Sequence, residues 1–337
     1  MADRDVFDVA IIGAGPAGLA AALYTSRDRY STLLLEKSGL PGGQIMLTER
    51  IDNYPGTPQV TGPDLIQAMV DQVRQFGTEI SIGQEVTSLM RRDDGAWHLD
   101  VNEGETAYDA RAVILSPGSS YRQLGVPGET EMRQAGKVSY CATCDGAFYR
   151  GKEVLTVGGG NTAVEDTLYL ATRFVKQATL IHRRREFRAQ QVLVEELQQA
   201  AKDKNVRIRL PYVLTKIVGN ADHSEIDHVE IRNVETKQVE HMKVDGVFIF
   251  VGMVPNTGFL RDVVGINDRG YIECDPVCLR TKARGIFTAG DCRVNAPMQL
   301  ATACADGVVA AMMLKQYFRD PDSWAKASAE ALGGTGW

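Results

Sequence analysis

The sequence has no long hydrophobic run. Of its 337 residues 44% are hydrophobic, yet no stretch approaches the roughly 18 to 20 apolar residues that a membrane-spanning helix needs. The first five residues are partly acidic where a secretory signal would be basic, and the apolar residues that follow run straight into a glycine turn. These absences predict a cytoplasmic chain with no membrane partner.

The sequence also lacks an excess of positive charge. The formal net charge is −6, and the local basic cluster lies at residues 182–185. Nucleic acid is therefore excluded as the main partner, because proteins that bind it present a basic patch or stripe. Cysteine is scarce too, and six cysteines in a cytoplasmic chain do not predict a structural disulfide framework. A disulfide in that compartment is usually catalytic.

No metal site is indicated by the spacing of cysteine and histidine. Cys274 and Cys278 could form a second dithiol or half of a zinc site, but no nearby pair completes four ligands. We interpret them as structural thiols and Cys304 as a core residue, whereas Cys292 could be oxidisable beside Asp291. The remaining histidines show no metal-ligand spacing and are interpreted as surface or structural residues: His98, His223, His228 and His241.

The chain is rich in glycine, with 33 residues, and two glycine fingerprints flank a Cys-x-x-Cys. The first fingerprint spans Gly13–Gly18, the dithiol is Cys141 and Cys144, and the second fingerprint spans Gly158–Ala163. Two nucleotide sites and a dithiol in one chain predict an electron relay from a nicotinamide through a flavin to a disulfide. The chain is thus predicted to be an enzyme.

The context of the first fingerprint supports nucleotide binding. A buried strand at Phe7–Ile12 leads into the glycine turn, a helix at 17–25 follows, and a second strand ends at Glu36. A carboxylate roughly 20 residues after the turn can accept hydrogen bonds from a ribose, while the pyrophosphate lies on the helix amino terminus. A plain tight turn is the alternative.

The second fingerprint carries the opposite charge at the corresponding place. A strand at 153–157, a helix at 162–172 and a strand at 178–181 are followed by His182 and three arginines, with Arg188 close behind. Guanidinium groups at this position can bind the 2′-phosphate of NADP through charge-assisted hydrogen bonds. The alternative is a solvated basic turn.

The remaining segments complete an α/β chain. The region 40–63 is irregular and is either a functional loop or an ordinary surface loop. We further expect a helix at 64–76, a β-meander at 95–112, a strand that ends at the Asp291 carboxylate, a buried helix at 301–314 and a polar tail from 319.

Together these motifs resemble the low-molecular-weight thioredoxin reductases, over about the first 317 residues. The most specific parts are Cys141–Gly146, Gly158–Glu165 with the basic turn, and Thr288–Asp291. The resemblance implies two Rossmann-like three-layer (ββα) nucleotide-binding domains, the NADPH domain being inserted into a split FAD domain. The implied boundaries are 1–118 and 249–320 for FAD, 119–248 for NADPH with the redox cysteines, and 321–337 for a tail.

The resemblance also implies which residues hold the cofactors. For FAD these are Gly13, Gly15, Ala17, Glu36, Gly43, Gln44, Thr48, Asn53, Val86, Asp291, Gln299 and Leu300. For NADPH they are Gly160, Asn161, Thr162, Ala163, Glu165, His182, Arg183, Arg184 and Arg188.

The catalytic roles are implied in the same way. Cys144 would face the flavin, Cys141 would attack the disulfide of thioredoxin or a thioredoxin-like protein, and Asp145 would move the proton. Asp145 could instead be a helix-terminal or turn residue. The NADPH domain would rotate about hinges near Gly118 and Gly252, and the enzyme would be a homodimer through its FAD domain.

The sequence is also compatible with other functions. The acceptor could be a glutaredoxin-like protein or a peroxidase component, and a redox-sensing nucleotide-binding protein with slow turnover is a further alternative. The chain departs from the family pattern at three places: Met298 before Gln299, Ser116–Gly118 in place of Ala-Thr-Gly, and Arg185-Glu186 in the basic turn.

Overall fold

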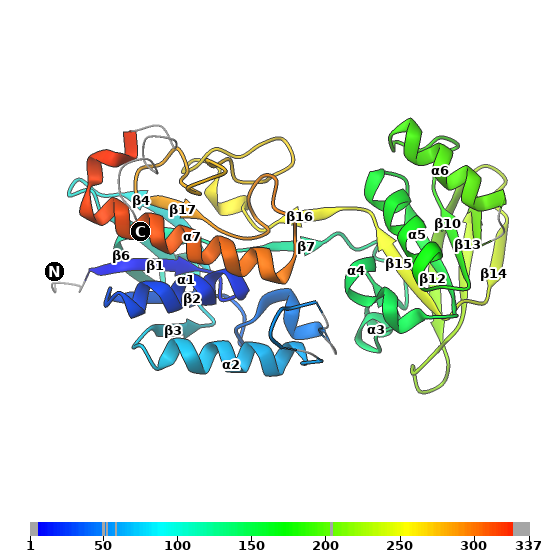
Figure 1. Ribbon diagram of the computed structural model, residues 1–337, viewed down its shortest axis with the longest axis horizontal. Helices are drawn as coiled ribbons and strands as arrows, with labels where there is room; N and C mark the ends of the chain where they lie inside the picture. Colours follow the sequence, from blue (N-terminus) through cyan, green and yellow to red (C-terminus); the bar gives the residue numbers. More distant parts are fainter. Residues whose placement is uncertain (1–5, 49–50, 52, 58, 203–204, 326–337) are drawn as a thin grey trace. The chain divides into compact units, whose positions relative to one another are not determined.

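The chain divides into two compact units, which are described separately (Figure 1). The computed structural model describes residues 6–48, 51, 53–57, 59–202 and 205–325. Unit 1 comprises Met1–Ser120 and Val254–Trp337, and unit 2 is Tyr121–Met253. The sequence-based boundary at 248/249 would cut a strand of unit 2, because β15 (Gly246–Phe250) pairs along its whole length with β9 (Glu153–Gly158).

Unit 1 is built on a seven-stranded sheet in the order β3-β2-β1-β6-β5-β4, with β17 also pairing with β6. The pairs among β3, β2, β1, β6 and β17 are parallel, and β4-β5-β6 form the expected antiparallel meander. The strands are β1 (Phe7–Ile12), β2 (Thr32–Glu36), β3 (Glu79–Ile82), β4 (Val86–Arg91), β5 (Trp97–Val101), β6 (Thr106–Leu115) and β17 (Ile286–Thr288).

Three helices cover one face of this sheet: α1 (Pro16–Arg27), α2 (Gly62–Arg74) and α7 (Leu300–Arg319). Successive residues of β1 face opposite layers, so that Ile11 packs among the helices and Ile12 packs against the meander. Figure 1 shows α7 running alongside α1. The two helices touch closely, because a Cβ at Gly307 would lie 2.1 Å from the Ala17 carbonyl oxygen.

Short 3₁₀ helices fill several connections of unit 1: η1 (Gly43–Leu47), η2 (Asn102–Gly104), η4 (Gly258–Leu260) and η5 (Pro321–Ala325). The first lies in the segment 40–63 that was expected to be irregular. The last lies in the expected tail, where Trp324 packs edge-on against Phe287 with ring centroids 5.1 Å apart. The start of the tail is therefore part of unit 1, and residues 326–337 lie outside the described residues.

Unit 2 has the same three layers as unit 1, but a separate antiparallel sheet takes the place of the β4-β5-β6 meander. Its parallel sheet has the order β11-β10-β9-β15-β8, and an antiparallel sheet has the order β12-β13-β14. The other strands are β8 (Val138–Ser139), β10 (Gln177–Ile181), β11 (Val206–Arg209), β12 (Tyr212–Gly219), β13 (Ile226–Asn233) and β14 (Val239–Met242). The helices are α3 (Glu129–Gln134), α4 (Ala142–Asp145), η3 (Gly146–Tyr149), α5 (Asn161–Arg173) and α6 (Gln191–Lys202).

Side chains along the central strands of unit 2 alternate between the two faces of the parallel sheet and so contribute to two separate hydrophobic cores. Phe248 packs with α5 and α6, whereas Val247 and Ile249 pack with the antiparallel sheet. Both units are thus ββα three-layer sandwiches, and the fold class predicted from the sequence is confirmed. The chain crosses between the units through β7 (Ser119–Tyr121) and β16 (Met253–Pro255), which pair with each other.

Candidate functional site

The redox dithiol is closed as a disulfide between Cys141 and Cys144, with Cα atoms 5.3 Å apart. It follows β8, at the carboxyl edge of the parallel sheet of unit 2, where open α/β sheets bind their ligands. Cys141 is the N-cap of the one-turn helix α4, and its Sγ accepts the Cys144 N–H at 3.2 Å. Both cysteines are partly exposed.

A buried serine links the dithiol to the neighbouring acid. Ser139 Oγ accepts the Cys141 N–H at 3.1 Å and donates to Asp145 Oδ2 at 2.6 Å. Asp145 is the last residue of α4 and the N-cap of η3, where its side chain makes no capping hydrogen bond. The sequence analysis missed Ser139, since no pattern separates it from an ordinary strand residue.

A second anchor holds the residue before Cys141. The Tyr140 hydroxyl donates to Glu129 Oε1 at 2.7 Å, and its ring stacks on Tyr121 with centroids 5.0 Å apart. Burial and the Glu129 hydrogen bond raise the pKa of Tyr140 well above its usual value, so the phenol stays protonated and donates. The side chains of Ser139 and Tyr140 therefore both anchor the segment that leads into Cys141.

The glycine turn of the second fingerprint lies beside the basic turn. The Arg188 N–H donates to the Gly159 carbonyl at 2.7 Å, and Gln190 N–H donates to Asn161 Oδ1 at 2.9 Å. These bonds fold residues 182–190 back onto the amino terminus of α5. No side chain caps this helix end, and a Cβ at Gly160 would meet nothing within 4 Å.

His182, the first residue of this turn, is buried next to Gly159. Burial, followed by the charges of Arg188, Arg183 and Arg184, lowers its pKa. Its Nε2 has no hydrogen-bond partner among the described residues. The three arginines are exposed. The neighbouring Arg185 differs from them, because its guanidinium forms a two-bond ion pair with Glu235.

The remaining sequence-predicted residues of this site lie in the first turn and a half of α5. Asn161, Thr162 and Ala163 occupy its first three positions, whose N–H groups have no acceptor within a helix. Ala163 is buried, whereas Thr162 and Glu165 are exposed. Backbone N–H groups and exposed side chains are therefore what this end of the helix offers to a ligand.

The first fingerprint has the same uncapped helix end in unit 1. Gly13 needs its φ of +100°, and a Cβ there would lie 2.3 Å from the Ser116 carbonyl oxygen. Ser116 supports the turn, since its hydroxyl donates to the Gly13 carbonyl at 3.0 Å. α1 begins after Gly15 with Pro16, and a Cβ at Gly15 would meet nothing within 4 Å.

Glu36 joins this turn from the end of β2. Its buried carboxylate accepts the Ala14 N–H at 2.8 Å, the Ser38 N–H at 2.9 Å and the Ser38 hydroxyl at 2.6 Å. A carboxylate has about four acceptor positions, so one remains for a ligand hydroxyl. The Gly42 N–H donates to the Ala14 carbonyl at 2.8 Å and brings the following residues, Gly43 and Gln44, to the turn.

Asp291 follows a glycine that packs against the start of α1. A Cβ at Gly290, the preceding residue, would lie 2.9 Å from the Ala17 side chain. Burial, together with the negative charge of Asp306, raises the pKa of Asp291 to about 6. The structure thus brings residues from four distant segments of unit 1 together at the amino terminus of α1.

Other predicted residues are placed less directly. Asn53 Nδ2 donates to Gln299 Oε1 at 3.4 Å, which joins the η1 region to the N-cap of α7. Leu300 is the first residue of α7, and Thr48 follows η1 directly. The Val86 side chain lies in the core, so only its backbone could face a ligand.

The prediction that Cys292 could be oxidisable is wrong. The thiol is completely buried, and burial raises its pKa to about 12. Its neighbour in the chain, Asp291, occupies a turn, while Cys292 packs into the core behind it. Cys278 and Cys304 are buried free thiols as expected, and burial raises the pKa of Cys274 to about 11.

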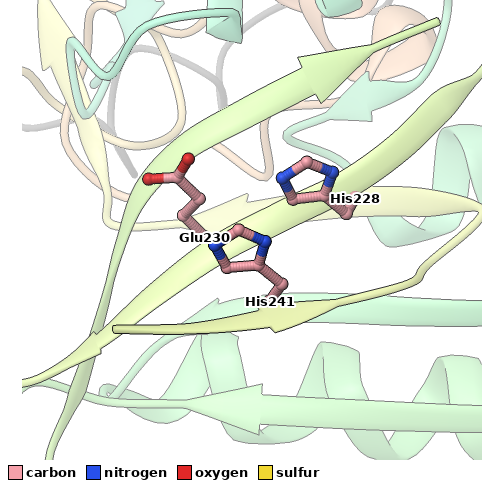
Figure 2. A group of neighbouring side chains, drawn as sticks. All are labelled: His228, Glu230 and His241. Atoms are coloured by element: carbon pink, nitrogen blue, oxygen red, sulfur yellow. The ribbon is translucent and has the colours of Figure 1, made fainter. Parts of the chain in front are cut away.

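Two of the histidines interpreted as surface residues, His228 and His241, are partly or fully exposed, as expected. His228, Glu230 and His241 place ligand atoms within 4.8 Å of one another (Figure 2). His228 and Glu230 alternate on β13, and the β13–β14 register sets Glu230 directly opposite His241 on the next strand. His98, in contrast, pairs with Asp109 at 2.6 Å as a structural histidine.

Comparisons with known proteins agree with this geometry. Residues 7–307 match the family of pyridine nucleotide-disulphide oxidoreductases. The thioredoxin reductase of Bacillus subtilis is 40% identical over 320 residues, which cover 95% of this chain and 97% of that protein. That of Listeria monocytogenes is 41% identical over 318 residues, covering 94% and 96%.

Solved structures give the same result. The thioredoxin reductase of Streptococcus pyogenes is 38% identical and superposes with a TM-score of 0.85, covering 94% of this chain and 99% of that one. Within the part of the chain searched, no helix is long and apolar enough to cross a membrane. The chain is an oxidoreductase that belongs to the pyridine nucleotide-disulphide oxidoreductase family and, within it, to the FAD- and NADPH-dependent low-molecular-weight thioredoxin reductases.

Proposed function

We propose that this enzyme passes electrons from NADPH through FAD to the Cys141–Cys144 disulfide and from there to the disulfide of thioredoxin. The observation that carries the proposal is the disulfide itself. It lies at the carboxyl edge of the parallel sheet of unit 2, the unit that also contains the second glycine fingerprint and the basic turn. When bound, NADPH supplies a hydride and FAD converts it into the electron pair that opens the disulfide.

Unit 1 would hold FAD at the amino terminus of α1. The open space at Gly15 and the uncapped helix end fit a pyrophosphate, because backbone N–H groups there point at the ligand. The remaining acceptor position of Glu36 fits a ribose hydroxyl. Asp291, which follows Gly290 beside Ala17, would accept from the ribityl chain, and Gln299 would donate to the isoalloxazine. The other contacts would come from Gly13, Gly43, Gln44, Thr48, Asn53, Val86 and Leu300.

Unit 2 would hold NADPH in the corresponding way. The space at Gly160 and the uncapped end of α5 fit a second pyrophosphate. The exposed guanidinium groups of Arg183, Arg184 and Arg188 fit the 2′-phosphate, and the unpartnered His182 Nε2 offers a further polar contact. Asn161, Thr162, Ala163 and Glu165 would complete the site.

The dithiol step needs only residues of this chain and the substrate. With Cys141 and Cys144 reduced, the Cys141 thiolate attacks the substrate disulfide and forms a mixed disulfide, and one substrate sulfur leaves as a thiolate. Cys144 then attacks Cys141 Sγ, which re-forms the Cys141–Cys144 bond and releases the second substrate sulfur. Asp145, held by Ser139, takes the proton of the Cys144 thiol as that thiol attacks and passes it to a leaving sulfur.

We propose that unit 2 rotates between the two half-reactions, with hinges at Gly118 and Gly252. The support is conformational: both have a positive φ, +67° and +100°, and an added Cβ would meet nothing within 4 Å at either. Identical unit orientations in crystals of the oxidised and the reduced, NADP-bound enzyme would refute the rotation. We also propose a cytoplasmic homodimer joined through unit 1, which sedimentation equilibrium tests.

Steady-state turnover with NADPH, and separately with NADH, against thioredoxins of the same cell tests the function. The Cys141→Ser variant should retain stopped-flow reduction of the bound flavin and lose thioredoxin reduction. A wild-type flavin that NADPH fails to bleach on the timescale of turnover overturns the reductase. Turnover with glutaredoxin-like or peroxidase substrates, and none with thioredoxin, overturns the acceptor.

A further inference from the structure

The outer face of the β13–β14 hairpin in unit 2 carries two histidines and a glutamate that the redox reaction does not use. Val229 and Ile231 of β13 and Met242 of β14 pack inward against the parallel sheet. Their alternating neighbours His228, Glu230 and His241 therefore share the opposite face. Figure 2 shows the three side chains on this face.

The two imidazoles are aligned. Their rings are stacked with centroids 4.6 Å apart and an angle of 6° between the planes. All three residues have a ligand atom within 4.8 Å of the others. Ligand atoms around a bound ion lie closer than this, because each metal–nitrogen bond is about 2.0–2.1 Å. Small side-chain rotations at a partly exposed surface are enough to close the difference.

A neighbouring carboxylate fixes the orientation of one imidazole. His228 Nδ1 lies 2.6 Å from Asp227 Oδ2, within hydrogen-bond distance. This contact occupies Nδ1 and leaves Nε2 as the ring nitrogen that a metal can reach. A carboxylate behind a histidine is the arrangement that orients histidine ligands in metal sites.

We propose that His228, Glu230 and His241 form a surface site for a divalent transition-metal ion of the Zn²⁺ type. Two imidazole nitrogens and one carboxylate oxygen suit zinc, whereas Mg²⁺ and Ca²⁺ take oxygen ligands. Three protein ligands leave one position for water. The bound ion would link β13 to β14 across the hairpin.

One cation lies close enough to compete. Lys216 on β12 is directly opposite Glu230, with Nζ 4.0 Å from Glu230 Oε1. The Lys216 side chain is half exposed, so it can turn into solvent when a metal arrives. The competition predicts a site of moderate affinity, and Lys216→Met should bind the ion more tightly than the wild type.

Isothermal titration of the full-length, FAD-loaded enzyme with Zn²⁺ tests the proposal. The enzyme is untagged and oxidised, so that Cys141 and Cys144 are closed as a disulfide and offer no thiolate. We expect one Zn²⁺ per chain, at least a tenfold loss of affinity in His228→Ala and in His241→Ala, and a loss of about 10-fold in Asp227→Asn. Mg²⁺ should give no binding.

The matched control is His223→Asn, which removes a histidine of the β12–β13 connection outside the cluster and should leave the titration unchanged. NADPH-dependent turnover in zinc-free buffer should equal that of the wild type in all these variants, which checks that they fold. Zinc binding that persists in the His228→Ala/His241→Ala double variant overturns the proposal. Absence of wild-type binding at about 1 mM Zn²⁺, far above the range of specific structural sites, also overturns it.

Discussion

Replacing Glu129 by glutamine should loosen the segment that carries the redox cysteines. Glu129 is 2% exposed, and its carboxylate accepts four hydrogen bonds. Oε1 accepts from the Leu124 N–H at 3.1 Å and the Tyr140 hydroxyl at 2.7 Å. Oε2 accepts from the Gly125 and Val126 N–H groups at 2.8 and 3.3 Å.

The size of the effect follows from this arrangement. Glutamine has the same shape, but its NH₂ group is a donor, so the donors on one side of the side chain lose their acceptor. Each unsatisfied buried donor costs about 1–3 kcal/mol. Gly125 is exposed and Val126 is partly exposed, so water can replace part of their hydrogen bonding. We therefore expect Glu129→Gln to lower the opening free energy of unit 2 by about 2–3 kcal/mol.

Native-state hydrogen exchange measures this loss locally. The amides of β8 and α4 in unit 2 should exchange roughly 30-fold to 150-fold faster, since 1.4 kcal/mol corresponds to a factor of ten. Tryptophan fluorescence would miss the change, because the residues of unit 2, 121–253, include no tryptophan. Flavin absorbance serves as the control that unit 1 stays intact.

A matched substitution on the same helix separates the buried network from a general effect of charge. Glu131 is exposed on α3, and Glu131→Gln should change the exchange by less than about 0.5 kcal/mol. Tyr140→Phe removes one of the four donors and should cost about 1–2 kcal/mol. Unchanged protection of β8 in Glu129→Gln would refute the reasoning.

Three further predictions concern the site and the stability of unit 2. Ser139→Ala removes the 2.6 Å hydrogen bond to Asp145. A hydrogen bond to a charged group contributes about 1.5–3 kcal/mol, so thioredoxin reduction should slow by roughly 10-fold or more, while stopped-flow flavin reduction by NADPH stays the same. Arg184→Gln should raise KM for NADPH roughly tenfold and leave NADH unaffected, whereas Arg185→Gln should change neither in steady-state assays, because Arg185 is already paired. Burial and an adjacent carboxylate raise the pKa of Asp166 to about 6. The unfolded state ionises near 4, so Asp166 destabilises the folded state increasingly from pH 4 to pH 6 and fully above it. Asp166→Asn should therefore stabilise unit 2 by about 2 kcal/mol at pH 8, and the gain should vanish near pH 4 in denaturation experiments.

Each of these predictions has a contrary result. Equal slowing of both half-reactions in Ser139→Ala would indicate a general loss of structure. A rise of KM in Arg185→Gln equal to that in Arg184→Gln would place the phosphate elsewhere in the basic turn. A gain from Asp166→Asn that is the same at pH 4 and pH 8 would show that its carboxylate is not the source of the instability.

The sequence predicted most of the architecture because glycine turns and buried strands are local signals. The strands at 7–12 and 32–36 have the predicted bounds, and the two fingerprints lie at uncapped helix ends. The boundary at which the chain returns from unit 2 to unit 1 was harder to predict, because the apolar run 247–251 could form a buried strand in either unit. Only the pairing of β15 with β9 assigns it.

The details of the site were less accessible from the sequence. Cys141 and Cys144 are recognised by spacing alone, but Ser139 and Glu129 act through contacts that depend on tertiary structure. The same limit explains the error at Cys292, whose neighbour is a site candidate while its own side chain points into the core. The His228 group was missed because cross-strand register, rather than sequence spacing, brings it together.

The pairing of β7 with β16 makes unit 2 a removable module. The Asn256 N–H donates to the Gly118 carbonyl, and the Arg122 N–H donates to the Gly252 carbonyl, each at 3.0 Å. The chain therefore leaves and re-enters unit 1 at neighbouring points. A short turn joining 118 to 256 would close unit 1 as a self-contained domain. Unit 2 has its own two hydrophobic cores. A recombination event that exchanged unit 2 would therefore leave the core of unit 1 unchanged.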